Sequence, residues 1–393
     1  MQKTSSAPYA AGMAVVGLIV AVALLFGLVV LYYVPLATGG DWFEHIRLVA
    51  QWRDTGVLEI THLLFHTFTL ALSSLALPLN AAAVIVILLS CEVTALILYA
   101  RMRRVMPTRP LGVALAVSAA LALMLIVPIP LLTLPRLYIG YIGITTYHSP
   151  TMLLLKPLAL LLFAFTLSAL DGTLKLNVRT ALIALLWCVL ATFAKPNYTL
   201  SLLPALGLVV VWRLFVGRRD LRRALESVAL PIWIGAVATA ILGFQYLLQY
   251  QFINVDAVGI GFAPFATVWY YDASRLTNIL KFFMSIAFPL AVTGLYWRTI
   301  RRDFVVGFSW LTFGMGAAQM YLLTEVGARA AHGNFWWGAQ ITLFLLFIVA
   351  LEWLVRHWDD VPRWRAWLCL GVFALHLVSG IHFYGIQFTT SIV

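Results

Sequence analysis

The chain has 393 residues, of which 63% are hydrophobic and only 10% are charged, and its mean hydropathy is +0.96. Soluble domains carry roughly 25% charged residues, so this composition excludes a soluble globular protein. Each backbone N–H and C=O inside a bilayer needs an internal partner, and long apolar runs without alternation therefore predict membrane-spanning helices. We expect an all-α, polytopic fold in a single transmembrane domain, residues 1–393, without a separate soluble domain.

About 11 spans are predicted, and the first is expected to be an uncleaved span because it is longer than the apolar core of a secretory signal. The sequence around Lys195 and Pro196 interrupts an apolar stretch, so the number of spans between 180 and 216 stays open. The expected spans are 11–34, 79–100, 111–134, 150–170, 180–194, 198–216, 228–248, 277–297, 304–324, 336–355 and 366–386.

The net charge of +11 comes largely from short basic clusters between the spans, at 101–104, 217–223 and 298–302. Such clusters are retained on the cytoplasmic side of a membrane, so they do not indicate a nucleic-acid partner. With the N-terminus in the cytoplasm, 18 of the 26 basic residues lie inside and the C-terminus lies outside. We expect an integral protein of the cell (inner or cytoplasmic) membrane with its active site on the outer face.

The first outer loop, 35–78, opens with Gly-Gly-Asp-Trp-Phe-Glu-His directly after the first span. Asp41 and Glu44 fit a capping box for a short helix over 42–54, which would lie in the membrane interface with its tryptophans as anchors. Capping does not require His45, which shares a helix face with Asp41 at i, i+4 spacing. The stretch therefore permits two interpretations, a capped interfacial helix or a catalytic group of Asp41, Glu44 and His45.

His62 and His66 are also four residues apart, and two imidazoles at this spacing can bind one metal ion. Two ligands do not make a site, and no outer cysteine adds a third. A divalent metal is one alternative for this pair, and polar packing beneath the loop is the other. The sequence specifies no other cofactor.

Two lysines are placed near the outer ends of spans. Lys156 either extends its amine to the interface or holds an anionic group, and Lys195 lies in the stretch interrupted by proline. Glu92 lies in the middle of the span 79–100. This position favours a structural role, in which Glu92 makes an interhelical hydrogen bond or is protonated. Further candidate substrate-binding groups in the outer segments are Tyr147, His148, Glu325, Arg329 and His332.

A first span, an acidic motif opening the first outer loop, interfacial helices and many further spans together resemble the GT-C superfamily of integral-membrane glycosyltransferases. The resemblance rests on GGDWFEH at its position after the first span. TTYHSPTMLLLKP, TFAKPNY and EVGARAAHGNFWWG are similar to segments of small bacterial members. The resemblance implies a polyprenyl-phosphate-linked sugar donor, and it implies that Asp41 is a catalytic base or orients the acceptor, with Glu44 implied less directly.

The chain departs from the family in two respects. Its acidic motif is spaced D-x-x-E rather than as an adjacent or once-separated acidic pair, and it shows no C-terminal soluble domain. The spacing leaves metal use open, and the subfamily, with the hexosyl or pentosyl group it transfers, is open as well. The resemblance also implies an acceptor, which is open among a glycan, a lipid and a protein.

The chemistry of such a donor fits the residues independently. A lipid phosphate needs an apolar groove and cations at the membrane edge, which Lys156, Lys195 and Arg329 offer, and sugar transfer needs a base such as Asp41. A transporter or flippase of lipid-linked or small anionic substrates is an alternative, as is a polymerase or ligase of polyprenyl-linked glycans. A transporter predicts broken spans at matching positions of two halves, and a polymerase predicts a large late outer loop rich in arginine. The sequence shows neither.

Overall fold

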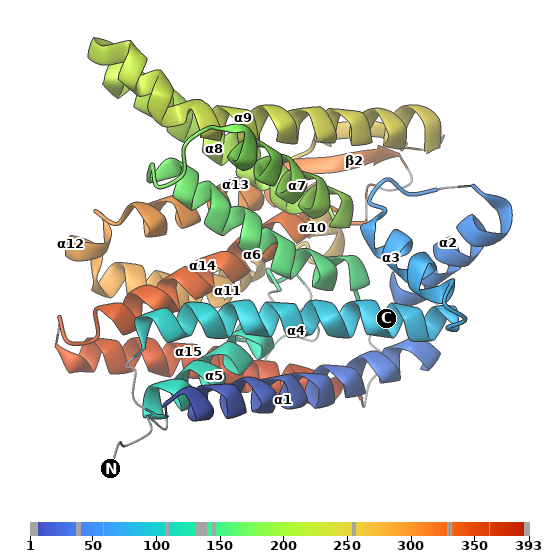
Figure 1. The fold of residues 1–393 in the computed structure, drawn as a ribbon, viewed down its shortest axis with the longest axis horizontal. Coiled ribbons are helices and arrows are strands. Elements are labelled where there is room, and N and C mark those ends of the chain that lie inside the picture. The colour runs from blue at the N-terminus through green and yellow to red at the C-terminus, as the bar shows by residue number, and fades with distance from the viewer. Residues whose placement is uncertain are drawn as a thin grey trace.

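The fold is known from a computed structural model, which describes residues 7–36, 41–57, 59–106, 110–130, 140–143, 147–253, 257–327, 330, 332–360 and 362–388. Long helices lie roughly side by side and form one bundle (Figure 1). The N-terminal half comprises α1 (Ala7–Leu36), α2 (Asp41–Thr55), α3 (Leu64–Ser73), α4 (Leu79–Val105), α5 (Pro110–Leu125), α6 (Pro150–Leu170), α7 (Val178–Ala194) and α8 (Asn197–Val216).

The C-terminal half continues with helices and adds one small sheet. Its elements are the 3-10 turn η1 (Gly217–Asp220), α9 (Leu221–Leu247), the π-helical turn η2 (Leu248–Ile253), β1 (Ala257–Phe262), α10 (Ala266–Tyr271), α11 (Arg275–Leu295), α12 (Trp297–Ile300), α13 (Phe304–Leu322), β2 (Leu323–Gly327), α14 (Trp336–Arg356) and α15 (Arg363–Ile386). Strands β1 and β2 pair antiparallel, with Ile260 opposite Glu325.

The described helices confirm an all-α, multi-pass protein embedded in a membrane. Seven segments within the described residues are long and apolar enough to cross a bilayer, and one of them runs through α8 and α9. Helix α14 is central, since 94% of its apolar window is buried, whereas the corresponding figure for α1 is 33%. The exposed side of α1 carries leucines and valines such as Val20 and Leu24, as expected of a helix that faces lipid.

The predicted span 111–134 is too long, because α5 ends at Leu125. Pro128 and Pro130 follow, and two prolines so close together disfavour a helix, because proline donates no backbone hydrogen bond and biases the residue before it away from helical backbone angles. Helix α15 supplies partners for the freed backbone: His376 Nδ1 lies 2.8 Å from the Val127 carbonyl oxygen, and the Ser379 hydroxyl donates to the Pro128 carbonyl at 2.6 Å. The side chains of a neighbouring helix thus make the early helix end tolerable inside the bundle.

The interruption predicted near Lys195 is confirmed. Helix α7 ends at Ala194, and α8 begins at Asn197. Lys195 has an extended backbone, with φ −167° and ψ 127°, as expected for a residue that precedes proline. Lys195 and Pro196 thus form the turn between the two helices.

Contacts between residues distant in sequence fall at two ends of the bundle. We call them the α2 end, which contains α2, α3 and the β1–β2 sheet, and the α12 end, which contains α12 and η1 (Figure 1). The α2 end is joined by contacts of Trp42 with Tyr147, Lys195 with Thr151, Gln245 with Thr61, and Tyr250 with Glu325. The α12 end is joined by contacts of Arg101 with Glu352, Arg213 with Leu170, and Arg365 with Leu295.

Candidate functional site

Helix α2 is fixed to the bundle by Trp42. The indole N–H donates to the Tyr147 carbonyl at 2.8 Å, and the ring meets Phe65 of α3 edge-on at a centroid distance of 6.4 Å. Trp42 is only 1% exposed, so the expectation that it anchors the helix in the membrane interface is wrong. Its packing holds the start of α2 against the segment that precedes α6.

The predicted capping box does not form. Asp41 is itself the first residue of α2, and the Glu44 carboxylate accepts two hydrogen bonds from Arg47, at 2.7 and 2.9 Å. These hydrogen bonds lower the pKa of Glu44 below its ordinary value, with burial opposing the shift. Glu44 is exposed, and its carboxylate is paired with the Arg47 guanidinium. No contact among the described residues joins Glu44 to Lys195 or His148.

Lys195 is the charged centre of the candidate site. Its ammonium group is buried, donates to the Thr151 hydroxyl at 3.1 Å, and lies 3.5 Å from the Ser149 hydroxyl oxygen. It also lies over the Trp337 ring, 4.3 Å from the centroid. Burial lowers the pKa of Lys195 to about 8, and the nearby Asp41 carboxylate opposes this shift. The lysine is therefore still predominantly protonated at neutral pH.

Asp41 is near enough to Lys195 for its charge to act on the ammonium group. It is partly buried, and within the described part of the chain its carboxylate makes no side-chain hydrogen bond. Its charge acts on both Lys195 and His148. The structure thus brings together three residues that the sequence analysis singled out in three separate segments.

His148 completes the polar lining beside Lys195. Its imidazole lies 5.7 Å from the Trp337 ring, so that this indole is shared by the lysine and the histidine. The residue keeps an exposed face, yet protein surrounds it closely enough to lower its pKa. Asp41 opposes this shift and Lys195 adds to it. His148 is thus an exposed imidazole beside a buried ammonium group.

Three histidines, from α2 and from the start of α3 and the segment before it, lie close together. His45 Nδ1 and His66 Nε2 are 3.1 Å apart and share a hydrogen bond, and the His62 ring lies 5.8 Å from the His45 ring. Burial lowers the pKa of His45 well below its ordinary value and that of His66 to about 4. Both imidazoles are therefore neutral at pH 7, and one nitrogen of the pair donates while the other accepts.

A metal ion held by His62 and His66 gains no support from this arrangement. Their ring centroids are 6.5 Å apart, and His66 Nε2 is already engaged by His45. Across the described ranges, no group of three or more His, Cys, Asp or Glu side chains is arranged to hold a metal ion. His45, His62 and His66 lie close together as a polar group.

Glu325 lies in β2 and belongs to a buried network at the same end. Its carboxylate accepts hydrogen bonds from the Tyr250 hydroxyl at 2.9 Å and from the Asn334 side chain. The Asn334 carbonyl in turn accepts a hydrogen bond from the Asn197 side chain at 2.6 Å. This chain of contacts ties the α7–α8 turn to the segment before α14, and it positions the turn that carries Lys195.

The remaining predicted residues lie elsewhere. Tyr147 is buried and stacks on Phe383 at 5.8 Å, so its ring packs inside the bundle. Lys156 is enclosed further along α6, with its ammonium 5.1 Å from the Phe344 ring and beside a cavity of about 10 Å³, room for about one water. Phe344 lies two turns beyond Trp337 on α14, about 10 Å along the helix axis. Lys156 and Lys195 thus occupy separate places.

His332 is exposed near the start of α14, and Arg329 falls outside the described residues. Five further residues of this site were not predicted from the sequence: Ser149, Thr151, Asn197, Asn334 and Trp337. These residues all lie in the segments HSPT, KPN and GNFWW. The sequence signal that could have identified them is that each lies a few residues after His148, Lys195 or His332.

No protein-family model matches the chain, and no curated protein matches it.

Proposed function

We propose that this protein is a membrane glycosyltransferase that moves a sugar from a polyprenyl-phosphate donor to an acceptor at the α2 end of the bundle. One observation carries the proposal: at the end of a bundle of apolar helices, the Asp41 carboxylate, which makes no side-chain hydrogen bond with the described residues, acts electrostatically on the buried Lys195 ammonium group. A base and a fixed cation side by side are what this transfer requires.

The reaction needs one bond to form and one to break. The acceptor hydroxyl oxygen bonds to the anomeric carbon, and the bond from that carbon to the phosphate oxygen breaks, leaving the polyprenyl phosphate with the electron pair. Asp41 takes the hydroxyl proton and later passes it to water. Lys195 and the Thr151 hydroxyl stabilise the negative charge on the leaving phosphate.

The aromatic and histidine groups support these two residues. Trp337 holds the Lys195 ammonium in place through its ring face, 4.3 Å away. His45 lies one helical turn beyond Asp41 on α2, and its hydrogen bond to His66 keeps α2 and α3 in register. A neutral imidazole pair stabilises this corner without adding positive charge that would compete with Lys195 for the phosphate.

We propose that the protein lies in a bacterial inner membrane. In the proposed orientation, the α2 end lies outside the cytoplasm and the N-terminus lies in the cytoplasm. The basic clusters support it, because 101–104, 217–223 and 298–302 all belong to the α12 end. A sugar carried on a polyprenyl phosphate would then meet the site from within the bilayer, with its head at the depth of Asp41.

The test uses the purified full-length chain in lipid nanodiscs with radiolabelled polyprenyl-phosphate hexose and pentose as probes. The proposal predicts release of polyprenyl phosphate together with loss of the sugar label from the lipid. A nucleotide sugar given as the donor should not react. Intact donor that crosses a vesicle bilayer without release of phosphate would instead show a transporter, and neither movement nor release with any probe would contradict the proposal.

A further inference from the structure

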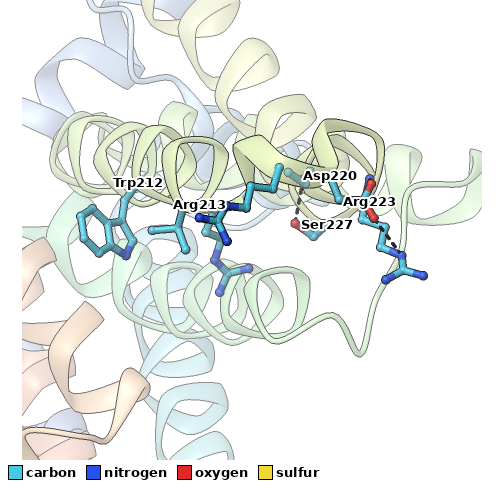
Figure 2. A pocket seen from close by; sticks show the side chains of 9 residues that line it. Trp212, Arg213, Asp220, Arg223 and Ser227 are labelled. Carbon is cyan, nitrogen blue, oxygen red and sulfur yellow. Dashed lines mark hydrogen bonds and ion pairs between the residues drawn. The ribbon is translucent and has the colours of Figure 1, made fainter.

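An open cavity lies at the α12 end, where α8 turns through η1 into α9 (Figure 2). Its volume is about 510 Å³. Gly217 makes this tight turn possible, because a Cβ atom at this position would lie 2.6 Å from the Ala224 Cβ. The cavity is lined by Trp212, Arg213, Val216, Gly217, Arg219, Asp220, Arg223, Ala224 and Ser227.

The lining carries three arginines and one carboxylate, and the carboxylate is already satisfied. Asp220 accepts a hydrogen bond from the Arg223 backbone N–H at 3.1 Å and pairs with the Arg223 guanidinium at 3.2 Å. Arg213 donates one hydrogen bond, to the Leu170 carbonyl at 2.5 Å. Arg219 makes no side-chain hydrogen bond or ion pair within the described residues. The cavity therefore has an uncompensated positive charge.

An apolar surface leads along α8 to this cavity. Leu208, Val211, Trp212 and Phe215 are between 52% and 65% exposed, and Trp212 packs against Phe215 at a ring-centroid distance of 6.4 Å. In a bundle of membrane helices, exposed side chains of this kind face lipid tails, and an exposed tryptophan near a helix end lies at the headgroup level. A ligand that matched both features would have an apolar tail and an anionic head.

We propose that this cavity binds the phosphate headgroup of an anionic phospholipid, whose acyl chains lie along the exposed face of α8. Guanidinium groups bind phosphate with two parallel hydrogen bonds, and basic pockets at the cytoplasmic ends of membrane helices suit anionic headgroups. Arg219 makes the main contact, and Arg213 and Arg223 line the same cavity. The site is independent of Asp41 and Lys195, which lie at the other end.

The test compares two neighbouring arginines with the same charge. Arg219→Gln removes a cavity-lining charge, while Arg218→Gln removes the next one along the chain, which does not line the cavity and lies over the Phe215 ring. Both side chains are exposed, so both variants should fold with the unfolding temperature of the unchanged protein. Native mass spectrometry of the full-length chain then counts phosphatidylglycerol and phosphatidylcholine retained from mixed vesicles.

The proposal predicts that the unchanged protein retains phosphatidylglycerol in preference to phosphatidylcholine. Arg219→Gln should weaken phosphatidylglycerol binding about tenfold or more, whereas Arg218→Gln should weaken it about fivefold at most, as the loss of one charge near an anionic surface does. Equal losses in the two variants would reduce the effect to general surface charge and overturn the proposal. Equal retention of both lipids would overturn it too, as would inorganic phosphate that binds in place of lipid.

Discussion

A buried lysine without a carboxylate in hydrogen-bonding contact is costly, because an ammonium group loses its hydration on burial. The Thr151 hydroxyl and the Trp337 ring offset part of this desolvation for Lys195, and the negative charge of Asp41 stabilises the ammonium group from farther away. An incoming phosphate would complete the set of partners. We therefore expect Lys195 to bind an anion more tightly than an exposed lysine does.

Lys195→Met should weaken binding of a polyprenyl-phosphate donor about tenfold or more, because a hydrogen bond to a charged group contributes roughly 1.5–3 kcal/mol. Lys175→Met is the matched control, since Lys175 is exposed at the α12 end. Equilibrium binding of the labelled donor to protein in nanodiscs measures both affinities. A donor affinity that is unchanged in Lys195→Met would remove this lysine from the proposed site.

The buried imidazole of His66 predicts a loss of stability in acid. Its pKa is about 4 in the folded protein, mainly through burial, whereas an unfolded histidine has a pKa near 6.5. The unfolded chain therefore binds the proton first as the pH falls below about 6.5. The stability is fully present above that pH, and about 2 kcal/mol should be lost between pH 7 and pH 5.

Thermal unfolding in detergent at pH 7 and pH 5 measures this loss. His66→Phe should reduce the difference between the two pH values, since it removes the titrating group. His332→Phe, which changes an exposed histidine, should leave the difference as it is in the unchanged protein. If His66→Phe unfolds with the same pH dependence as the unchanged protein, His66 does not control acid stability.

Single residues could be predicted where a charge stood out in an apolar sequence. Asp41, His45, His148 and Lys195 were chosen for that reason, and the structure places them at one end of the bundle. Their partners could not be predicted, because a hydrogen bond such as His45 to His66 depends on how α3 folds back on α2. For the same reason, the sequence could not show that Lys156 is enclosed at a place apart from Lys195.

At the scale of elements, hydropathy predicted the helices because a spanning segment must be both apolar and helical. A helix lies in each of the expected spans, although α5 ends at Leu125. The β1–β2 sheet and the π-helical turn η2 were not predicted. The strands are only six and five residues long and pair across some sixty intervening residues, so no local period distinguishes them from loop.

The contact of α5 with α15 depends on Gly380. A Cβ atom there would lie 1.9 Å from the Leu125 carbonyl oxygen, and a backbone atom at the end of α5 cannot move aside cheaply. Gly380→Ala should therefore destabilise the protein by about 1–3 kcal/mol or more, as overpacking does. Gly371→Ala in the same helix meets nothing within 4 Å and should be neutral or slightly stabilising. Equal unfolding temperatures for the two variants would contradict this packing.

At the scale of the whole molecule, the long helices produce two chemically different ends. Basic clusters gather at the α12 end, whereas Asp41, the histidines and Lys195 gather at the α2 end. Because cytoplasmic loops carry the excess of Lys and Arg, this division predicts that the two ends lie on opposite sides of the membrane. Cys91, Cys188 and Cys369 are all buried. They should therefore not react with a thiol reagent that labels an engineered, exposed cysteine.

Single cysteines at Val57 and Arg302 test the orientation, since both positions are exposed and lie at the α2 end and the α12 end respectively. A membrane-impermeant maleimide given to intact cells should label Val57→Cys. It should label Arg302→Cys only after the cells are opened. Labelling of both from outside would contradict the two-sided arrangement, and labelling of Arg302→Cys alone would reverse it.

The central claim is that Asp41 accepts the proton of the acceptor hydroxyl, and turnover of Asp41→Asn tests it most directly. Asparagine keeps the size and the hydrogen-bonding oxygen of aspartate but does not take up a proton at neutral pH. Asp54→Asn is the matched control, because Asp54 is exposed in the same helix and pairs with Arg53. The measurement is single-turnover release of polyprenyl phosphate from the labelled donor by purified protein in nanodiscs. We predict that Asp41→Asn folds and binds the donor normally yet reacts about 10²–10⁴-fold more slowly, while Asp54→Asn reacts at the rate of the unchanged protein. Turnover of Asp41→Asn within about threefold of the unchanged protein, far less than the loss of a base costs, would contradict the account.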